Sequence, residues 1–139
     1  MEQPSAEYFV LAIEDNSEQV ELIQNAFQAD TVACRVEAIA EKTEALNFLR
    51  NSAERPDIIL LNLSGEQGRD ILTELKSSEH LRRIPVVILT DSTDKEDILS
   101  SYMLQGNSYV IKSSDRDRLY ETVQRIKAFW LGIVTLPSE

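Results

Sequence analysis

The sequence predicts an α/β fold in which a doubly wound, five-stranded parallel sheet carries five helices on its two faces. Short, mostly apolar segments alternate along the chain with longer segments whose apolar residues recur at helical spacing. Continuous apolar runs are typical of strands that are covered on both faces, as the strands of a parallel sheet are. The length of 139 residues suits one domain, and no repeat or Pro/Gly-rich linker divides it.

The predicted strands are the short apolar runs. The clearest are residues 8–13 and 58–61, in which every side chain is apolar. Pro85 introduces a third clear run, because proline fits the start of a strand better than its interior. The five predicted strands cover residues 8–13, 34–38, 58–61, 86–89 and 108–111.

Each predicted strand is followed by a segment with one apolar face. We expect Asn16 or Ser17 to cap the first helix and Ser114 the last, since short polar side chains accept hydrogen bonds from free N–H groups. Gly106 is expected to end the fourth helix. The predicted inward faces are Val20, Ile23, Ala26 and Phe27; Ala45, Leu46 and Leu49; Ile71, Leu72 and Leu75; Ile98, Leu99, Tyr102 and Met103; and Leu119, Val123, Ile126 and Trp130.

The composition excludes several classes of protein. Fourteen Lys and Arg against 24 Asp and Glu give a net charge of −10, which opposes a broad electrostatic contact with nucleic acid or anionic lipid. Cys34 and His80 are the only residues of their types, which argues against a disulfide framework and a multi-histidine metal centre. No apolar run reaches the roughly 18 residues of a membrane span, and the N-terminus lacks the basic start of a secretion signal. We therefore expect a cytoplasmic protein that contacts neither nucleic acid nor membrane.

Three parts of the chain are expected: an N-terminal extension over 1–7, one domain over 8–130, and a C-terminal tail over 131–139. The tail is too short for a helix-turn-helix, and the net charge is wrong for DNA. We therefore expect any output to pass through protein contacts.

Polar side chains follow the predicted strands where the carboxyl ends of a parallel sheet meet, the edge at which such folds place their functional sites. They are Glu14, Asp15, Asn62, Thr90 and Lys112. Taken singly, each fits a solvated turn, a strand-end cap or a surface cation. Together, a hydroxyl and an ammonium beside two carboxylates are suited to hold an anion next to a metal ion. The first turn contains no glycine, so nucleotide binding through a Gly-rich loop is disfavoured.

These motifs resemble the receiver domain of bacterial two-component response regulators, over about residues 8–136. The motifs that carry the resemblance are residues 12–16, 56–61, 84–90 and 108–112. The resemblance implies a flavodoxin-like arrangement of the sheet. Longer segments are similar to the phytochrome-associated subgroup of single-domain regulators, namely residues 81–85, 102–109 and 128–137.

The resemblance implies a phosphorylation switch. Glu14 and Asp15 match the magnesium-binding acids of the family, and Lys112 matches the lysine that pairs with the acyl phosphate. Thr90 matches the hydroxyl that follows the phosphoryl group, and Tyr109 matches the aromatic residue that turns inward behind it. For Tyr109, simple packing is the alternative interpretation.

The pattern breaks at the phosphoacceptor position, which is Asn62. A neutral amide is a very poor nucleophile, and its loss of charge weakens the binding of a divalent ion. The carbonyl oxygen of Asn62 still leaves weak magnesium binding open, with Glu14 and Asp15 as vestigial ligands, and Lys112 is able to donate a hydrogen bond to that oxygen. No cofactor is expected to be required.

Three further departures surround the same site. The loop predicted over residues 63–68 is two residues short of the family pattern and lacks its proline and Asp-Gly step. Ser113 stands where the family normally has a proline, and Asp91 places a carboxylate near the phosphate position. We therefore predict a pseudo-receiver, a response regulator that is not an enzyme and acts by protein–protein interaction without aspartyl phosphorylation.

Two alternatives remain open at this point. The chain is either an active phosphorelay regulator with another acceptor, Ser64 or Asp70, or a domain that reuses the crevice for a metal or small molecule. Ser64 lies in the right loop but has no evident base. Aromatic or Gly-rich pocket signals are missing from the sequence, which disfavours a small-molecule site.

The C-terminal end predicts a homodimer. Phe129 and Trp130 are neighbours that point to different helix faces, so both cannot lie on one core-facing stripe. An aromatic side chain left outside the core is a common interface anchor, and the resembling subgroup dimerises through this end. We expect Phe129, Trp130, Ile133 and Leu136 in the interface, with folding onto the chain's own core as the alternative. The expected partner is a phytochrome-like sensor histidine kinase or another signalling protein.

Overall fold

The computed structural model describes residues 7–29, 32–62, 65–90, 108–133 and 136. Its centre is a single parallel sheet of five strands in the order β2-β1-β3-β4-β5, which confirms the predicted α/β fold. The strands are β1 (Tyr8–Glu14), β2 (Cys34–Ile39), β3 (Ile58–Asn62), β4 (Val86–Thr90) and β5 (Ser108–Ile111).

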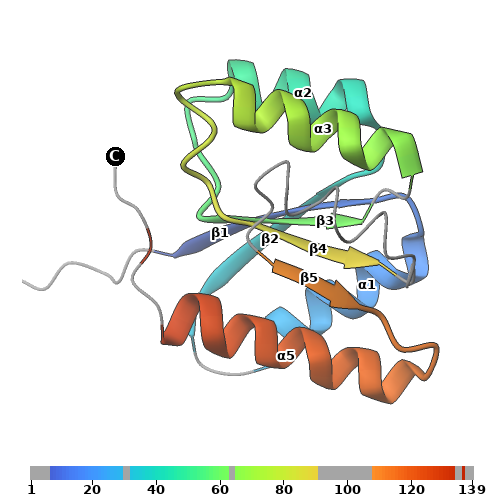
Figure 1. Cartoon of the computed structure of the whole chain (residues 1–139). Helices are drawn as coiled ribbons and strands as arrows, with labels where there is room; N and C mark the ends of the chain where they lie inside the picture. The colour runs from blue at the N-terminus through green and yellow to red at the C-terminus, as the bar shows by residue number, and fades with distance from the viewer. Residues whose placement is uncertain (1–6, 30–31, 63–64, 91–107, 134–135, 137–139) are drawn as a thin grey trace, which may run out of the picture.

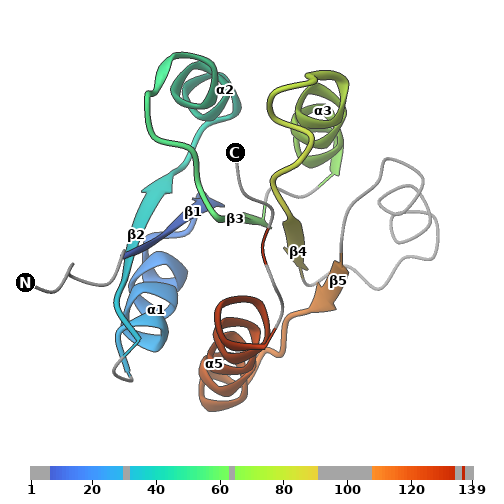
Figure 2. The same cartoon turned by 90° about the vertical axis from the view of Figure 1, so that its left-hand side faces the viewer.

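Helices cover both faces of this sheet. The described helices are α1 (Ser17–Phe27), α2 (Lys42–Asn51), α3 (Gly65–Ser77) and α5 (Arg116–Gly132). Helices α1 and α5 lie against one face, and α2 and α3 against the other (Figures 1 and 2). The predicted fourth helix, with its end at Gly106, falls outside the described residues. No described helix is long and apolar enough to cross a lipid bilayer.

The apolar runs are buried on both sides, as a doubly covered sheet requires. In β1, Val10 and Ala12 join the core beneath α1 and α5, whereas Leu11 and Ile13 join the core beneath α2 and α3. Consecutive side chains of a strand point to opposite faces, so a continuous apolar run supplies both cores. All four of these residues are at most 1% exposed.

The helix starts are set by polar caps. Asn16 caps α1, as predicted, because its side chain accepts hydrogen bonds from the backbone N–H groups of Glu18 and Gln19. The prediction of Ser114 as the cap of α5 is wrong, since Asp115 takes that role. A carboxylate at this position accepts hydrogen bonds and is also favoured by the positive end of the helix dipole.

The segment after Asn62 also differs from the prediction. Residues 65–68 were expected in a loop, yet α3 begins at Gly65. Gly68 lies inside α3, where glycine is about 1 kcal/mol less favourable than alanine, but the buried face of Ile71, Leu72 and Leu75 holds α3 against the sheet. Tertiary packing here outweighs local preference.

The buried face of α5 is broader than the predicted stripe. Trp130 is only half-buried and packs against the core from its margin. The buried residues of α5 are Leu119, Val123, Ile126, Lys127 and Leu131. The ammonium of Lys127 donates hydrogen bonds to the carbonyl oxygens of Phe27 and, at 2.9 Å, of Val32. This lysine therefore ties α5 to the end of α1, where the helix dipole favours a cation.

Candidate functional site

Parallel pairing brings the predicted site residues to one edge of the sheet. Glu14 and Asn62 are register partners at the ends of β1 and β3. Thr90 ends β4, and its carbonyl oxygen accepts a 2.7 Å hydrogen bond from the backbone N–H of Lys112. The arrowheads of β3, β4 and β5 point to this edge in Figure 1. The predicted convergence of Glu14, Asn62, Thr90 and Lys112 therefore agrees with the structure.

Four of the side chains at this edge form a connected polar network, which consists of Glu14, Gln19, Asn62 and Lys112. The amide Nδ2 of Asn62 donates a hydrogen bond to Oε1 of Glu14 and lies 3.5 Å from Oε1 of Gln19. Lys112 Nζ lies 2.5 Å from Gln19 Oε1 and 3.8 Å from Glu14 Oε1. The backbone N–H of Asn16 donates to the second oxygen of Glu14 at 3.1 Å.

Glu14 is the buried carboxylate of this network, with only 2% of its surface exposed. Burial raises its pKa above the usual 4.5, because a charged carboxylate loses hydration there. Hydrogen bonds from Asn62 and Asn16, together with the charge of Lys112, oppose that rise in pKa. The carboxylate and the ammonium balance each other within the network.

A magnesium ion would compete with contacts that this arrangement already makes. Both oxygens of Glu14 already accept hydrogen bonds, and Asn62 turns its N–H group toward the carboxylate. Asp15 is exposed, in contrast to Glu14. Among the described residues, no group of three or more His, Cys, Asp or Glu side chains could hold a metal ion. A divalent ion would have to displace hydrogen bonds that the chain itself supplies.

The remaining predicted positions divide into two groups. Thr90 is buried and Tyr109 is half-buried in β5, where it pairs in register with Ile88. Ser64 and Asp91 lie outside the described residues. The roles that the resemblance implies for Thr90 and Tyr109 stay predictions.

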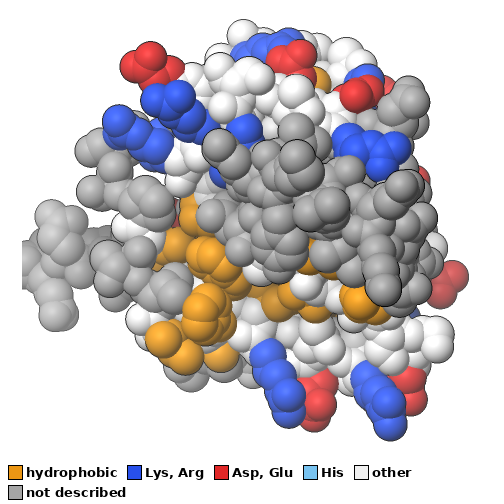
Figure 3. Space-filling view, in the orientation of Figure 1, with side chains coloured by type: hydrophobic (Ala, Val, Ile, Leu, Met, Phe, Trp, Pro, Cys, Tyr) orange, Lys and Arg blue, Asp and Glu red, His pale blue; other side chains and the backbone are white. Residues whose placement is uncertain are grey.

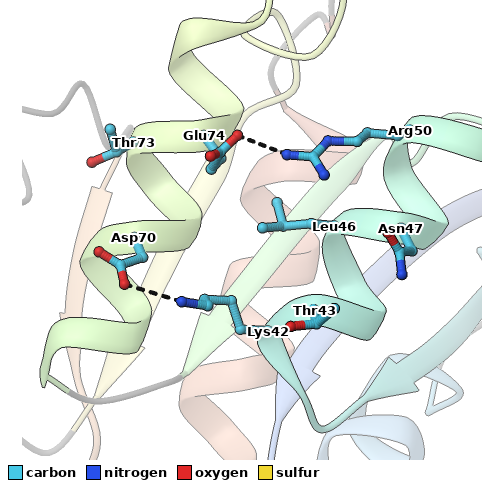
Figure 4. A pocket seen from close by; sticks show the side chains of 8 residues that line it. All are labelled: Lys42, Thr43, Leu46, Asn47, Arg50, Asp70, Thr73 and Glu74. Atoms are coloured by element: carbon cyan, nitrogen blue, oxygen red, sulfur yellow. Dashed lines mark hydrogen bonds and ion pairs between the residues drawn. The ribbon is translucent and has the colours of Figure 1, made fainter.

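Asp70, the other alternative acceptor, lies in a surface groove between α2 and α3 (Figure 4). Its carboxylate pairs with Lys42 at 3.1 Å, and one turn further Glu74 pairs with Arg50 at 2.8 Å. The groove has a volume of about 380 Å³ and is lined by Lys42, Thr43, Leu46, Asn47, Arg50, Asp70, Thr73 and Glu74. It includes no member of the polar network, so Asp70 is engaged elsewhere on the molecule.

Gln19 is the member of the polar network that the sequence analysis missed. It lies in the first turns of α1, four residues after Asp15. A signal was available in the predicted fold, because the helix after β1 must begin at the carboxyl edge of the sheet. Inward side chains of its first turns can therefore reach the site. Neither its type nor its spacing from the acids identifies it, however.

The predicted interface residues at the end of α5 fall into two pairs. Trp130 and Leu136 pack partly buried against the core. Phe129 and Ile133 are 46% and 73% exposed and lie one helical turn apart, so they share a face. We call these two residues the α5 patch. Hydrophobic side chains gather at this end of α5 in Figure 3, and the Phe129 ring packs edge-on against Trp130 at 5.4 Å between centroids.

Comparison with known proteins identifies the family. Residues 10–124 match the response regulator receiver domain. The chain is 37% identical over 136 residues to response regulator Rcp1 of Synechocystis sp. (strain ATCC 27184 / PCC 6803 / Kazusa), covering 93% of this chain and 92% of Rcp1. It is also 37% identical over 131 residues to the probable methanogenesis regulatory protein FilR2 of Methanothrix harundinacea (strain 6Ac), covering 90% of this chain and 84% of FilR2.

Solved structures of similar proteins agree with this family assignment. The phosphorylated cyanobacterial phytochrome response regulator RcpA is 40% identical, with a TM-score of 0.91 over 96% of this chain and 100% of that one. The Mn²⁺-bound form of Rcp1 is 35% identical, with a TM-score of 0.88 over 94% and 99% of the two chains. The sheet order, the site residues at its carboxyl edge and these matches show together that the chain belongs to the response regulator receiver domain family, and that it is similar to the phytochrome-associated members.

Proposed function

We propose that this response regulator is a pseudo-receiver, which signals through protein contacts without phosphorylation at residue 62. The observation that carries the proposal is the amide of Asn62 at the phosphoacceptor position, bound to the buried carboxylate of Glu14. An amide does not form the mixed anhydride that a carboxylate forms with phosphorus. On this proposal the chain is a binding module and catalyses no reaction of its own.

The charge balance of the polar network supports this proposal. Glu14 contributes one negative charge, Lys112 contributes one positive charge, and Asn62 and Gln19 are neutral. A third carboxylate in place of Asn62 would leave excess negative charge that a divalent cation normally offsets. The network is complete without such an ion. We therefore expect that the protein requires no cofactor and binds magnesium more weakly than a receiver that has an aspartate at the phosphoacceptor position.

The proposed contact surface is the α5 patch. Large apolar residues that stay exposed side by side are typical of interaction sites, and a symmetric homodimer buries one copy of Phe129 and Ile133 against the other. The relatives Rcp1 and RcpA suggest a phytochrome-like sensor histidine kinase as a further partner, since RcpA is named as a phytochrome response regulator. With a net charge of −10, the proposed site of action is the cytoplasm, away from nucleic acid and membrane surfaces.

Phosphate transfer from a small donor tests the proposal. The protein is incubated with acetyl phosphate and magnesium beside RcpA, whose phosphorylated form is known, and intact mass is measured. We expect an adduct on RcpA and none on this chain. A stoichiometric adduct that hydroxylamine removes would overturn the proposal by showing an acyl phosphate, as on Asp70. A hydroxylamine-stable adduct would point to a phosphoester, as on Ser64.

A further inference from the structure

Gln19 occupies a central position in the polar network. Its Oε1 lies 2.5 Å from the ammonium of Lys112 and 3.5 Å from Nδ2 of Asn62. The Lys112 side chain is only 9% exposed, and its anionic neighbour, Glu14 Oε1, is further away at 3.8 Å. Among the described residues, a neutral oxygen from α1 is therefore the nearest acceptor of this buried ammonium.

That oxygen competes with any phosphoryl group at residue 62. Stabilising a transferred phosphoryl group is mainly a matter of placing donors on its oxygens. Lys112 has three N–H donors, but a buried ammonium already directed at Gln19 must turn away before it can meet a new oxygen. Hydrogen bonds to charged groups are stronger than those between neutral groups, so this rearrangement opposes phosphorylation.

We propose that Gln19 is a second barrier to phosphorylation, separate from Asn62, because it holds Lys112 toward α1. Gln19 is thus a positioning residue that supplies internally the acceptor that an anion would otherwise supply. The inference rests on the proposed function, since it explains how the same crevice stays inactive. The inference predicts that Asn62→Asp alone is phosphorylated slowly, because Gln19 on α1 still holds the ammonium of Lys112.

The test compares Asn62→Asp with the double variant Asn62→Asp/Gln19→Met. Methionine keeps the approximate length of glutamine and removes the acceptor. In either variant a carboxylate oxygen of residue 62 forms a bond to phosphorus, the bond from phosphorus to the acetyl oxygen breaks, and acetate leaves with that electron pair. We expect the double variant to be labelled at least about tenfold faster, and tenfold is about 1.4 kcal/mol. Rates within twofold of each other would overturn the proposal.

Two further variants exclude indirect effects. Gln24→Met makes the same change on the same helix, and Gln24 takes no part in the hydrogen bonds and ion pairs of the polar network. It should leave the labelling rate of Asn62→Asp unchanged. Gln19→Glu keeps the acceptor and adds negative charge, so with Asn62→Asp it should be labelled no faster than Asn62→Asp alone. Faster labelling of Asn62→Asp/Gln24→Met or of Asn62→Asp/Gln19→Glu than of Asn62→Asp alone would contradict the proposal. This comparison still decides the matter if Gln19→Met fails to fold.

A readout without phosphate separates positioning from simple structural support. Hydrogen exchange of the Lys112 ammonium, followed by ¹⁵N NMR with Asn62 in place, should be at least about threefold faster in Gln19→Met because its nearest acceptor is gone. The ammonium of Lys127, bound to carbonyl oxygens far along the chain, serves as the internal reference. Equal acceleration of both ammonium groups would show general loosening and would refute a specific role. A hydroxylamine-labile adduct on the wild-type chain would contradict the proposed function, whereas the role of Gln19 is decided by the comparison of the Asn62→Asp variants.

Discussion

The polar network and the α5 patch differ in how their side chains are satisfied: the network pairs its polar groups internally, whereas the α5 patch leaves apolar side chains exposed. In the network, Glu14, Asn62, Lys112 and Gln19 supply one another's partners. At the end of α5, Phe129 and Ile133 have large exposed surfaces. The chain thus pairs its polar groups with one another at the carboxyl edge of the sheet and leaves an apolar surface exposed at the end of α5.

The difference follows from the free-energy cost of a buried polar group compared with that of an exposed apolar side chain. A buried polar group without a partner is costly, so a change at residue 62 must be balanced by neighbouring side chains. Two buried side-chain atoms lack a hydrogen-bond partner among the described residues, Arg35 Nε and Ser108 Oγ, and neither belongs to the network. An exposed apolar side chain has no such requirement, and its gain comes when a partner covers it.

The largest expected effect comes from recharging the network. Asn62→Asp removes the amide donor from Glu14 and places a second carboxylate beside it, so we expect a loss of about 2–4 kcal/mol of unfolding free energy at neutral pH. Magnesium should recover part of that loss by binding both acids. Urea unfolding with and without magnesium measures both effects.

Asn47→Asp is the matched control for that change, because Asn47 is exposed on α2. Its effect should stay within about 0.5 kcal/mol. If Asn62→Asp were as stable as the wild type without magnesium, the network would accept a second charge, and the contrast between the two regions would fail.

The next effect concerns association. Changing Phe129 and Ile133 together to serine should weaken self-association at least about tenfold, or about 1.4 kcal/mol, while the monomer stays folded because both side chains are exposed. Trp130→Ser should instead lower the melting temperature, since Trp130 packs against the core. Sedimentation and thermal unfolding separate the two outcomes.

Val32→Ser is the control for association, since Val32 is an apolar residue 39% exposed elsewhere on the surface. It should leave self-association unchanged. A wild-type chain that is monomeric at tens of micromolar, about the range of weak interfaces, would contradict the homodimer.

Smaller effects are expected at the caps that begin α1 and α5. Asn16→Ala and Asp115→Ala should each cost about 1 kcal/mol, because two backbone N–H groups lose their acceptor in each case. Ser114→Ala should change stability by less than about 0.5 kcal/mol. Chemical denaturation of the three variants measures these changes in the free energy of unfolding. A large loss of stability in Ser114→Ala would show that Ser114 caps α5 after all.

The smallest effect is on pH dependence. Burial raises the pKa of Glu14 above 4.5, so the folded chain binds this proton more tightly than the unfolded chain does. That contribution to stability is fully present below pH 4.5 and is lost as the pH rises through the raised pKa. Glu14→Gln removes the ionisation, so the stability of the wild type minus that of the variant should fall across this window. Parallel curves from denaturant titrations at several pH values would show that Glu14 ionises normally.

Much of the fold could be predicted because its signals are local. The run from Tyr8 to Ile13 is buried on both faces, and parallel strands with right-handed crossovers bring their carboxyl ends to one edge. Glu14, Asn62, Thr90 and Lys112 were therefore placed together from sequence alone. The start of α3 at Gly65 was missed because packing of the helix on the sheet outweighs the low helix preference of glycine.

The partners within the site were decided only by the tertiary structure. Lys112 contacts Gln19 across 93 residues of chain, and Asn62 contacts Glu14 across 48. A buried ammonium or amide turns to whichever acceptor the neighbouring elements bring nearest. Helix packing also decides the positions of Trp130 and Phe129, since the orientation of α5 on the sheet places the Trp130 ring against the core and leaves the Phe129 ring exposed. Residue type and strand period determined which groups meet at the edge of the sheet, and the packing of α1 and α5 determined which of them bind each other.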